Sequence, residues 1–373
     1  MKILIVGAGA SGIVAAINYK RNHPSDEVFV IEHLSEPLKK LLATGNGRCN
    51  LANTNIDISR FSHPEFVKNI LKEYNYKELC DSISLKTRVI DGLVYPYSES
   101  AVSVRNAFLK EAEKQKINIK VDEKLIDYNV EKQIEVITNK KKYQADRLYL
   151  ATSLLSGNGL GSDGSILKII EKHNYKIKRP LPGLCPIVAK EDTKILDGMR
   201  IKCEAKLYEN NKLIHTEKGE VLFKKNGLSG IVIFNISSLV ARGGKNNVKV
   251  CLDLLPDISL ESLKNDCKTR TSDELLNSYF SPKIAKYLSS RFADKNALIE
   301  AIKNLEFTFE DFYDFIYSQV SVGGVDLSMV NDHLESKHEK GVYLLGELLD
   351  VDGPCGGYNL TWAFASAIHA TKN

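Results

Sequence analysis

The stretch KILIVGAGASG, residues 2–12, decides the fold of this chain. It opens with a short run dominated by apolar and β-branched residues, which is typical of a buried parallel strand. The run leads directly into Gly7, Gly9 and Gly12, the glycines of a GxGxxG pattern. Helical spacing follows in IVAAINYKRN, and EVFVIE predicts a second strand that ends on Glu32. Strand, glycine turn, helix and terminal acid together are the fingerprint of a dinucleotide-binding βαβ unit.

Each glycine of this fingerprint has its own physical role. Gly7 permits a tight turn, Gly9 lets the backbone approach a pyrophosphate, and Gly12 lets the helix pack closely on the strand. The N-terminus of the helix that follows offers free N–H groups and a positive dipole end to that pyrophosphate, and Ala10 and Ser11 of the loop are included in the predicted site. The competing interpretation is a strand–helix turn without a ligand, which the complete strand–helix–strand–acid context disfavours.

Glu32 extends the prediction to the ribose. Its carboxylate can accept hydrogen bonds from the ribose hydroxyls, and its charge disfavours the 2′-phosphate of NADP at this position. His33 follows the acid directly and is included in the predicted site. The fingerprint by itself does not separate NAD from FAD.

The loop after the second strand favours a flavin. An NAD domain normally continues with alternating strands and helices, whereas residues 36–53 read EPLKKLLATGNGRCNLAN. Small residues, backbone donors and side-chain amides suit a loop that wraps an extended ligand, and the alternative is a surface loop with a helix C-cap at Gly45. The candidate ligand-binding residues in this loop are Lys39, Lys40, Thr44, Gly45, Gly47, Arg48, Cys49 and Asn50.

Two later segments point the same way. Residues 117–152 read as a β-meander, and residues 343–347 read as a strand that ends on the acid Glu347. A glycine loop and a helix over about residues 358–370 follow. In a split flavin domain the acid can hold ribityl hydroxyls, and the N-terminus of the last helix can stabilise negative charge on the flavin pyrimidine. Gly356 and Gly357 would let the ring approach the backbone, and Tyr358, Asn359 and Leu360 would offer first-turn amides.

A second GxGxxG pattern lies at residues 159–164. It is separated from the preceding strand by several loop residues, and no second βαβ unit with a terminal acid follows it. We interpret it as part of the first domain rather than as a separate nicotinamide domain. A nicotinamide would then bind transiently over the flavin, or oxygen would be the oxidant.

The middle of the chain has a different pattern. Residues 199–225 alternate like a hairpin with a turn at Asn210-Asn211, and helical periodicity dominates from Leu260 to Tyr317. The predicted fold is α/β, with a Rossmann-like domain split between the N- and C-terminus, an inserted small β domain and a helical subdomain. The predicted boundaries are 1–185 with 323–373 for the split domain, 186–258 for the β domain and 259–322 for the helical subdomain.

Composition excludes several classes of site. A formal charge of +4 over 373 residues neither demands nor excludes a nucleic acid partner, and the absence of aromatic residues interleaved with basic ones argues against one. The seven cysteines contain no CxxC pair, so no zinc site is expected, and Cys49 and Cys355 are interpreted as packed thiols rather than a redox pair. His333 and His338 are not interpreted as metal ligands. The first strand begins at Lys2 and no apolar run spans a bilayer, so we expect a cytoplasmic protein without a leader or a membrane segment.

Three motifs together resemble one family. TGNGRCNLAN, GGVDL (residues 323–327) and GELLDVDGPCGGYNLTWAF are similar to the BaiN/YhiN-like flavoproteins, NAD(P)/FAD-dependent oxidoreductases of which some are described as aminoacetone oxidases. They belong to the glutathione-reductase-like flavoproteins, and the resemblance covers nearly the whole chain. It implies one FAD bound in an extended pose by a split domain, with an inserted region over the flavin.

The resemblance assigns residues by position. It places the adenosine-ribose acid at Glu32, the phosphate loop at residues 7–12 and the flavin-side loop at residues 40–50. It places an adenine-facing backbone contact at Leu125. It places the ribityl and pyrimidine contacts at Gly346, Glu347, Gly357, Tyr358, Asn359 and Leu360. The family's ATGG is replaced here by Ala151-Thr152-Ser153-Leu154, which puts the substrate in doubt more than FAD binding.

The leading hypothesis is therefore an FAD-dependent oxidoreductase. Its flavin accepts hydride from NAD(P)H and reduces an electron-poor C=C bond of a small organic substrate. An amine oxidase that uses oxygen, an FAD-dependent RNA-modifying protein and a non-catalytic flavin module remain alternatives. No catalytic side chain and no oligomeric state is predicted from the sequence.

Overall fold

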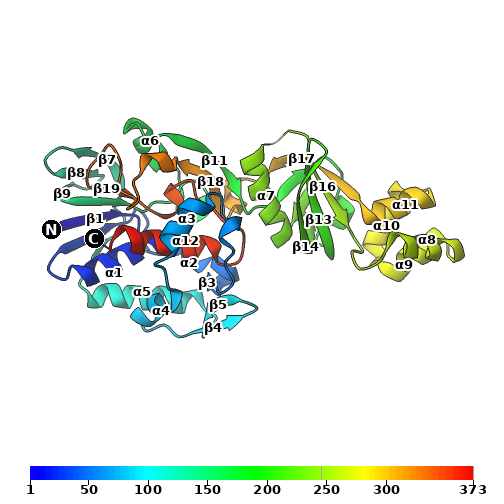
Figure 1. The fold of residues 1–373 in the computed structure, drawn as a ribbon, viewed down its shortest axis with the longest axis horizontal. Helices are drawn as coiled ribbons and strands as arrows, with labels where there is room; N and C mark the ends of the chain where they lie inside the picture. The colour runs from blue at the N-terminus through cyan, green and yellow to red at the C-terminus, as the bar shows by residue number, and fades with distance from the viewer. Residues whose placement is uncertain (245, 373) are drawn as a thin grey trace. The chain divides into compact units, whose positions relative to one another are not determined.

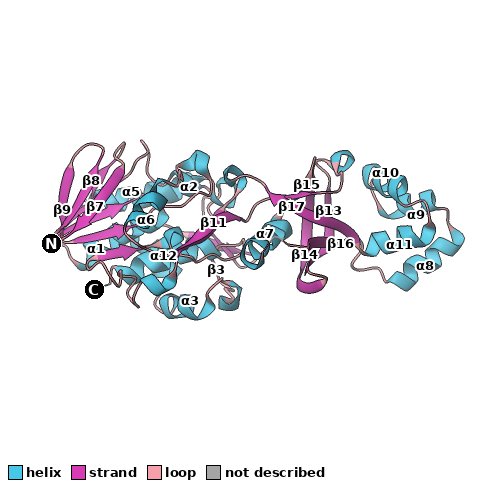
Figure 2. Ribbon diagram, turned by 90° about the horizontal axis from the view of Figure 1, so that it is seen from above, coloured by secondary structure: helices cyan, strands magenta, loops and turns pink. Residues whose placement is uncertain are grey.

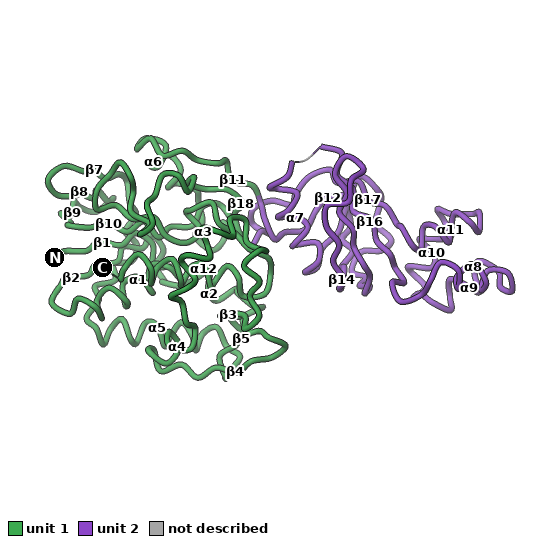
Figure 3. The backbone as a smooth tube through the Cα atoms, viewed as in Figure 1, with its two compact units in different colours: residues 1–181, 320–373 green, residues 182–319 purple. Residues whose placement is uncertain are grey.

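A computed structural model describes residues 1–244 and 246–372 of the chain. The chain divides into two compact units (Figure 3). Unit 1 comprises Met1–Leu181 and Val320–Asn373, and unit 2 comprises Pro182–Gln319. The chain thus leaves unit 1 once, builds unit 2 and returns. The changes of pattern that the sequence places at residues 186 and 323 fall close to these two crossings.

The core of unit 1 is a five-stranded parallel sheet with the order β19-β10-β1-β2-β6, of which Figure 1 labels β1 and β19. Its strands are β1 (Lys2–Val6), β2 (Glu27–Ile31), β6 (Asn118–Lys120), β10 (Arg147–Leu150) and β19 (Val342–Leu344). The central strand β1 is buried over four of its five residues, as expected where both faces of a parallel sheet are covered. The predicted α/β class is confirmed. Because all strands are parallel, the carboxyl ends of β1 and β19 lie at the same edge, although they come from opposite ends of the chain.

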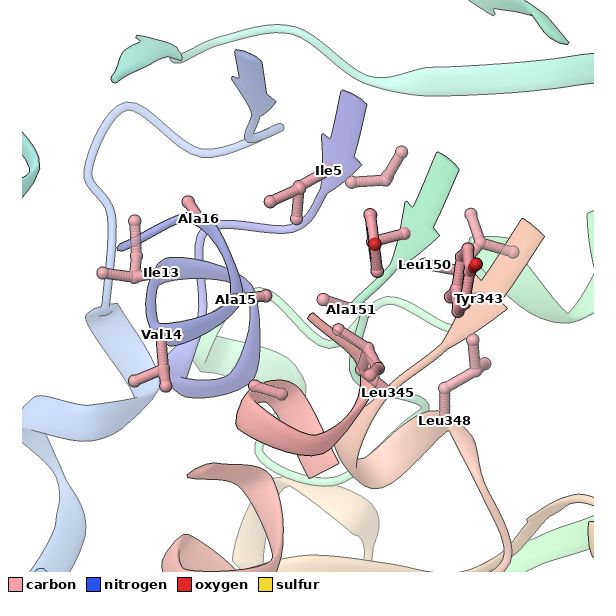
Figure 4. Packing of buried hydrophobic residues seen from close by; sticks show 14 of the residues in the cluster. Ile5, Ile13, Val14, Ala15, Ala16, Leu150, Ala151, Tyr343, Leu345 and Leu348 are labelled. Atoms are coloured by element: carbon pink, nitrogen blue, oxygen red, sulfur yellow. The ribbon is translucent and has the colours of Figure 1, made fainter. Parts of the chain in front are cut away.

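Helices α1 (Ala10–Asn22), α5 (Ala101–Lys114) and α12 (Tyr358–Ala370) lie on one side of β1 in Figure 1. Helix α1 packs against both of the others. Figure 4 shows Ala15 on the side of α1 that faces Ala151 at the end of β10, whereas Ile13 and Val14 point away from the strands. Ala15 and Ala16 are fully buried, and their small side chains let α1 approach its neighbours closely. The first and last helices of the chain therefore share one core.

Two small antiparallel sheets complete the β-structure around this core. One is a meander of β7 (Leu125–Val130), β8 (Ile134–Thr138) and β9 (Lys142–Ala145). The other is β3 (Ala52–Asn53), β4 (Thr87–Ile90) and β5 (Leu93–Pro96). The prediction of one meander over residues 117–152 is too long, since β6 and β10 at its ends pair in the parallel sheet. The last three residues of β10 are buried, which suits a central strand rather than a one-faced meander.

The remaining elements of unit 1 connect these layers. The helices are α2 (Lys39–Leu42), α3 (Pro64–Leu71), α4 (Tyr76–Ser82) and α6 (Ser165–Lys172). Strands β11 (Ile177–Gly183) and β18 (Val320–Val325) pair where the chain leaves and re-enters unit 1. None of the helices in residues 1–244 and 246–372 is long and apolar enough to cross a membrane.

Unit 2 is a closed barrel with the strand order β12-β15-β14-β13-β16-β17 (Figure 2). Its strands are β12 (Ile187–Ala189), β13 (Arg200–Glu209), β14 (Lys212–Lys224), β15 (Gly227–Ser229), β16 (Val248–Asp253) and β17 (Leu305–Phe312). The helices are α7 (Ile231–Gly243), α8 (Leu260–Thr269), α9 (Ser272–Tyr279), α10 (Pro282–Arg291) and α11 (Lys295–Lys303). The predicted turn at Asn210-Asn211 joins β13 to β14, and both residues have positive φ, which asparagine tolerates.

The predicted helical range from Leu260 to Tyr317 is wrong beyond Lys303. The next residues, LEFTFEDF, form β17, which pairs with β16 and β12 and closes the barrel. Their buried and exposed side chains largely alternate, with aromatic residues on the buried face, which is the period of a strand and not of a helix. The four helices α8–α11 are therefore an insertion between two barrel strands.

Candidate functional site

The glycine turn after β1 is packed against backbone at two of its three glycines. Gly7 has a φ of +99°, and a Cβ there would lie 2.7 Å from the carbonyl oxygen of Ala151. A Cβ on Gly12 would lie 1.9 Å from the carbonyl oxygen of Gly7. At Gly9, by contrast, a Cβ would meet no described atom within 4 Å. The fold thus requires Gly7 and Gly12, whereas the space beside Gly9 is open.

This open space lies at the start of α1, which begins at Ala10 and runs for 13 residues. The N–H groups of its first turn have no partner within the helix, and the helix dipole makes this end positive. Ser11, in the same turn, is buried. A Cβ on Gly346 would lie 2.8 Å from the Ser11 hydroxyl oxygen. The start of the first helix therefore touches the segment that carries the C-terminal acid.

Glu32 is held as an anion at the end of β2. It is 7% exposed and accepts hydrogen bonds from the backbone N–H groups of Ala8 at 2.8 Å and Leu34 at 2.9 Å. The His33 Nδ1 lies 2.9 Å from Glu32 Oε1, the same oxygen that accepts from Leu34. Burial alone would raise the pKa of Glu32, but hydrogen bonds from His33, Leu34 and Ala8 outweigh it and lower the pKa. The hydrogen bond to Glu32 raises the pKa of His33 in turn.

A cavity opens beside this acid and the glycine turn. Leu125, at the start of β7, and His33 contribute to its wall, so the structure brings both predicted residues to one place. Thr152 also lines it, and its buried hydroxyl has no hydrogen-bond partner among the described residues. The full lining is Val6, Gly7, Ile31, His33, Glu123, Lys124, Leu125, Thr152, Ser165, Ile166 and Ile169. We call it the adenosine-side cavity, because it adjoins the acid predicted to bind ribose.

The glycine loop at residues 159–164 closes against the same region. Gly161 has a φ of +106°, and a Cβ there would lie 2.5 Å from the side chain of Leu34 and 3.4 Å from that of His33. Helix α6 follows the loop and supplies part of the cavity wall. The second GxGxxG pattern thus belongs to the first unit and packs beside the first pattern's acid.

The flavin-side loop is a compact turn rather than an extended strand. Gly45 and Asn46 have φ values of +56° and +60° within a short 3₁₀ segment. The Thr44 hydroxyl donates a hydrogen bond to the carbonyl oxygen of Leu41 at 2.7 Å. Gly47 has a φ of +82° with open space at its Cβ position. The loop therefore leaves its glycine backbone accessible on one side.

Arg48, Cys49 and Asn50 end this loop in three different environments. The Arg48 guanidinium lies 4.8 Å from the ring centroid of Tyr95 and is exposed. Cys49 is buried, and burial raises the pKa of its thiol to about 11, so the thiol is a packed and protonated group. Oriented to satisfy its hydrogen bonds, the Asn50 amide donates to the carbonyl oxygen of Ala52 at 2.9 Å and accepts from the N–H of Gly357 at 3.1 Å.

Glu347 lies at the centre of a polar cluster that joins four segments. Lys40 Nζ lies 2.6 Å from Glu347 Oε2 and also 2.6 Å from Ser156 Oγ. Ser156 donates its hydroxyl to the other carboxylate oxygen. The backbone N–H of Ser321 donates to that oxygen at 2.9 Å. Of the two predicted lysines, only Lys40 reaches this cluster within the described residues, and Lys39 stays half-buried at the start of α2.

The turn before α12 is fixed by close backbone packing and side-chain hydrogen bonds. Gly357 has a φ of +88°, and a Cβ there would lie 2.6 Å from the carbonyl carbon of Ala52. Asn359 exchanges two hydrogen bonds with the backbone of Gly353, at 3.0 and 2.8 Å. The Tyr358 hydroxyl accepts from the N–H of Asp57 at 3.1 Å. These side chains shape the turn, and the Gly357 N–H is already paired with Asn50, so the N–H groups of the residues that follow Gly357 are the ones left to meet a ligand.

The acid and the last helix are also tied together. The Trp362 Nε1 donates to the carbonyl oxygen of Gly346 at 3.0 Å, and the Gly346 N–H donates to Ser366 at 3.1 Å. Leu360 lies in the first turn of α12 and is half-buried. The structure thus gathers the predicted residues of both chain ends along one edge of the sheet.

Sequence reasoning missed the two serines of the Glu347 cluster. Ser321 holds the loop after β10 as well, because its hydroxyl accepts from the N–H groups of Leu155 at 3.1 Å and Ser156 at 3.0 Å. The only sequence signal was that Ser156 lies just beyond the position where the chain departs from the family's ATGG. In the described part of the chain, no group of three His, Cys, Asp or Glu side chains could hold a metal ion.

The chain is similar to known proteins over its whole length. The family model described as HI0933-like protein Rossmann domain matches residues 1–373. The chain is 34% identical to the 3-dehydro-bile acid delta(4,6)-reductase of Clostridium scindens, over 100% of this chain and 98% of that protein. It is 25% identical to the ribosomal RNA dihydrouridine synthase of Escherichia coli, over 98% and 95%.

The fold also has a solved counterpart. The 3-ketosteroid delta1-dehydrogenase from Sterolibacterium denitrificans superposes with a TM-score of 0.52 at 9% identity, covering 99% of this chain and 98% of that one. Such low identity shows the shared fold alone. Together with the match over its full length, these relatives show that the chain belongs to the HI0933-like protein family of flavoprotein oxidoreductases.

Proposed function

We propose that unit 1 holds one FAD across the carboxyl edge of its sheet. The adenosine end would lie beside Glu32, against the residues that line the adenosine-side cavity, and the diphosphate would lie at Gly9 and the start of α1. The isoalloxazine would lie between the flavin-side loop and the start of α12. The observation that carries this proposal is the open space at Gly9 next to a helix N-terminus, in a turn that is otherwise packed against backbone.

The described residues fit this cofactor. The anionic Glu32 suits ribose hydroxyls and repels a 2′-phosphate, which favours FAD over an NADP-like ligand here. The unpartnered hydroxyl of Thr152 offers a polar contact in the cavity. Glu347 receives donors from this chain on both of its oxygens, so we expect it to meet the ribityl chain with its remaining acceptor capacity while Lys40 balances its charge.

The reaction we propose is reduction of a C=C bond conjugated to a carbonyl group. Bound FAD would supply the hydride chemistry, with NAD(P)H as the electron source. The N–H groups at the start of α12 would stabilise negative charge near the flavin pyrimidine. The name of the relative with 34% identity describes a reductase of such a bond in a 3-dehydro-bile acid, which supports a small organic substrate.

A second candidate is reduction of a uracil base in ribosomal RNA. It is favoured by the relatives from Escherichia coli and Haemophilus influenzae, which carry the name ribosomal RNA dihydrouridine synthase and match 98% of this chain. Uracil also carries a C=C bond conjugated to a carbonyl group, so both candidates require the same hydride chemistry. The names of these two relatives therefore count against the sequence-based expectation of no nucleic acid partner.

The test begins with the purified protein. A flavin absorption spectrum and chromatography of the released cofactor identify FAD. Anaerobic mixing with NADH or NADPH is expected to bleach the flavin, and a 3-oxo-Δ4 bile acid or unmodified ribosomal RNA is expected to restore its colour. Bleaching by a small amine without a nicotinamide would favour the amine oxidase instead. A flavin that no donor reduces would favour the non-catalytic module.

A further inference from the structure

A buried ionic cluster lies next to the adenosine-side cavity, with His173 at its centre. His173 Nδ1 lies 2.6 Å from Glu339 Oε1, and its Nε2 lies 3.1 Å from Asp127 Oδ1. The three side chains are only 11%, 14% and 15% exposed, respectively. The imidazole ring stacks on the ring of Tyr128 with centroids 3.7 Å apart. A histidine clamped between two carboxylates is well placed to carry a proton.

The hydrogen-bond pattern indicates that this proton is present. Ionised carboxylate oxygens only accept, so both ring nitrogens of His173 are satisfied when both carry hydrogen. The hydroxyls of Tyr128 and Tyr175 donate to Glu339 Oε2 at 2.6 and 2.8 Å, which favours the ionised form of Glu339. Burial would lower the pKa of His173, but hydrogen bonds to Glu339 and Asp127 outweigh it and raise the pKa.

Other charged and titratable groups face the cluster from each neighbouring element. Lys172 at the end of α6 pairs with Asp127. His338 Nε2 lies 3.0 Å from the backbone carbonyl oxygen of His173, and its ring lies 4.5 Å from that of Tyr175. Burial alone would raise the pKa of both carboxyls, but hydrogen bonds from Lys172 and His173 lower the pKa of Asp127, and those from His173, Tyr128 and Tyr175 lower the pKa of Glu339.

The cluster ties one end of α6 to β7, and a second ion pair ties the other. Lys124, just before β7, lies 2.6 Å from Asp163, just before α6. Burial would raise the pKa of Asp163, but hydrogen bonds from Lys124 and Ser165 bring it to about 2. Between these ties, α6 and β7 form part of the wall of the adenosine-side cavity. Ionic interactions therefore hold α6 against β7 at both ends of this wall.

We infer that His173 is a positioning residue for the bound dinucleotide, because its protonated ring holds α6 against β7 and so keeps the cavity wall closed. The inference rests on the proposed function only in naming FAD as the ligand of this cavity. When His173 loses its proton, one of its two carboxylate contacts loses its hydrogen bond, and the tie at this end weakens. FAD affinity should then fall as the pH rises through the raised pKa of His173.

The experiment measures the Kd of the apoprotein for FAD by flavin fluorescence between about pH 6 and about pH 9, the range in which histidine titrates. For the wild type we expect Kd to rise with pH, about tenfold for each unit by which FAD binding raises the His173 pKa. His173→Gln should bind FAD more weakly and with a smaller pH dependence, the remainder belonging to His33, which lines the same cavity and whose pKa its hydrogen bond to Glu32 also raises. His215→Gln, the same change at a histidine 3.4 Å from Glu217 in unit 2, is the matched control and should keep the wild-type curve.

Two further variants separate this role from a general loss of structure. Lys172 is 66% exposed, and its charge opposes protonation of His173, so Lys172→Ala should fold and should move the midpoint of the Kd curve to higher pH. Asp163→Asn loosens the other tie and should weaken FAD without moving that midpoint. If His173→Gln does not fold, Lys172→Ala carries the test.

The outcomes distinguish this inference from the proposed function. A wild-type Kd that is flat with pH, a pH slope unchanged in His173→Gln, or an unmoved midpoint in Lys172→Ala would overturn the role of His173 while leaving FAD binding intact. Failure of the wild type to bind FAD at any pH would instead reject the proposed function.

Discussion

The glycine turn after β1 allows a variant that separates the fold from the cofactor. Gly9 has a φ of −79°, which any residue can adopt, and a Cβ at this position would meet no described atom within 4 Å. We therefore expect Gly9→Ala to fold. As Gly9 is the N-cap of α1, where alanine is a poor substitute, the apoprotein should lose no more than about 1 kcal/mol of stability.

The same methyl group should strongly impair FAD binding. It would fill the space in which the diphosphate is proposed to approach the backbone N–H groups at the start of α1. Each hydrogen bond to a charged group contributes about 1.5–3 kcal/mol. Loss of one or two of them predicts a penalty of about 1.5–6 kcal/mol, which is at least roughly a tenfold higher Kd.

Gly12→Ala is the matched variant with the opposite expectation. Its Cβ would lie 1.9 Å from the carbonyl oxygen of Gly7, so the helix or the turn must shift. Overpacking of this kind costs about 1–3 kcal/mol or more, and here it acts on the apoprotein itself. Thermal unfolding of both apoproteins, together with FAD titration by fluorescence, measures the contrast. If Gly9→Ala binds FAD as tightly as the wild type does, the diphosphate does not lie at this turn and the reasoning fails.

Four other variants or conditions test the remaining parts of the site. Glu32→Ala should weaken FAD by about 1–3 kcal/mol in a calorimetric titration, and an unchanged Kd would reject the ribose assignment. Glu347→Gln leaves the ammonium group beside it without an anion and should lower both FAD affinity and the unfolding temperature; a wild-type value for both would contradict this. Gly357→Ala, which combines a φ of +88° with a Cβ 2.6 Å from the Ala52 backbone, should lower apoprotein stability by at least about 1–3 kcal/mol in chemical denaturation. His173 has a raised folded-state pKa, so its stabilising contribution is complete below about pH 6.5 and is lost as the pH rises through that raised value. A free energy of unfolding in urea that is the same below about pH 6.5 and above the raised pKa would refute the assignment.

The fingerprint could be predicted from the sequence because its causes are local. A strand, a turn with Gly7 at positive φ, a helix and Glu32 are each encoded within a few residues, and the structure has all of them. The last helix is predictable for the same reason, since the apolar spacing of residues 358–370 is encoded locally. The family resemblance contributed residues such as Leu125, whose position in the cavity wall no local pattern could give.

The Glu347 cluster could not be predicted because its causes are distant in sequence. Lys40, Ser156, Ser321 and Glu347 come from four separate segments, and serine carries no pattern that announces a buried partner. The strand β17 was missed for a different reason. It follows four helices, and the helical periodicity was extended past Lys303 although the alternation of the next residues indicates a strand.

The position of Gly346 links the two ends of the chain within the proposed site. Its carbonyl oxygen accepts from Trp362 and its N–H donates to Ser366, so the acid next to it is fixed by the last helix. Its α-carbon also lies against Ser11 in the first turn of the first helix. A diphosphate bound at α1 and a flavin bound at α12 would therefore act on one packed unit. Binding at a hundred times Kd would add about 2.7 kcal/mol to the stability of that unit, and because the two helices share a core, this gain should protect the amides of both helices from hydrogen exchange together.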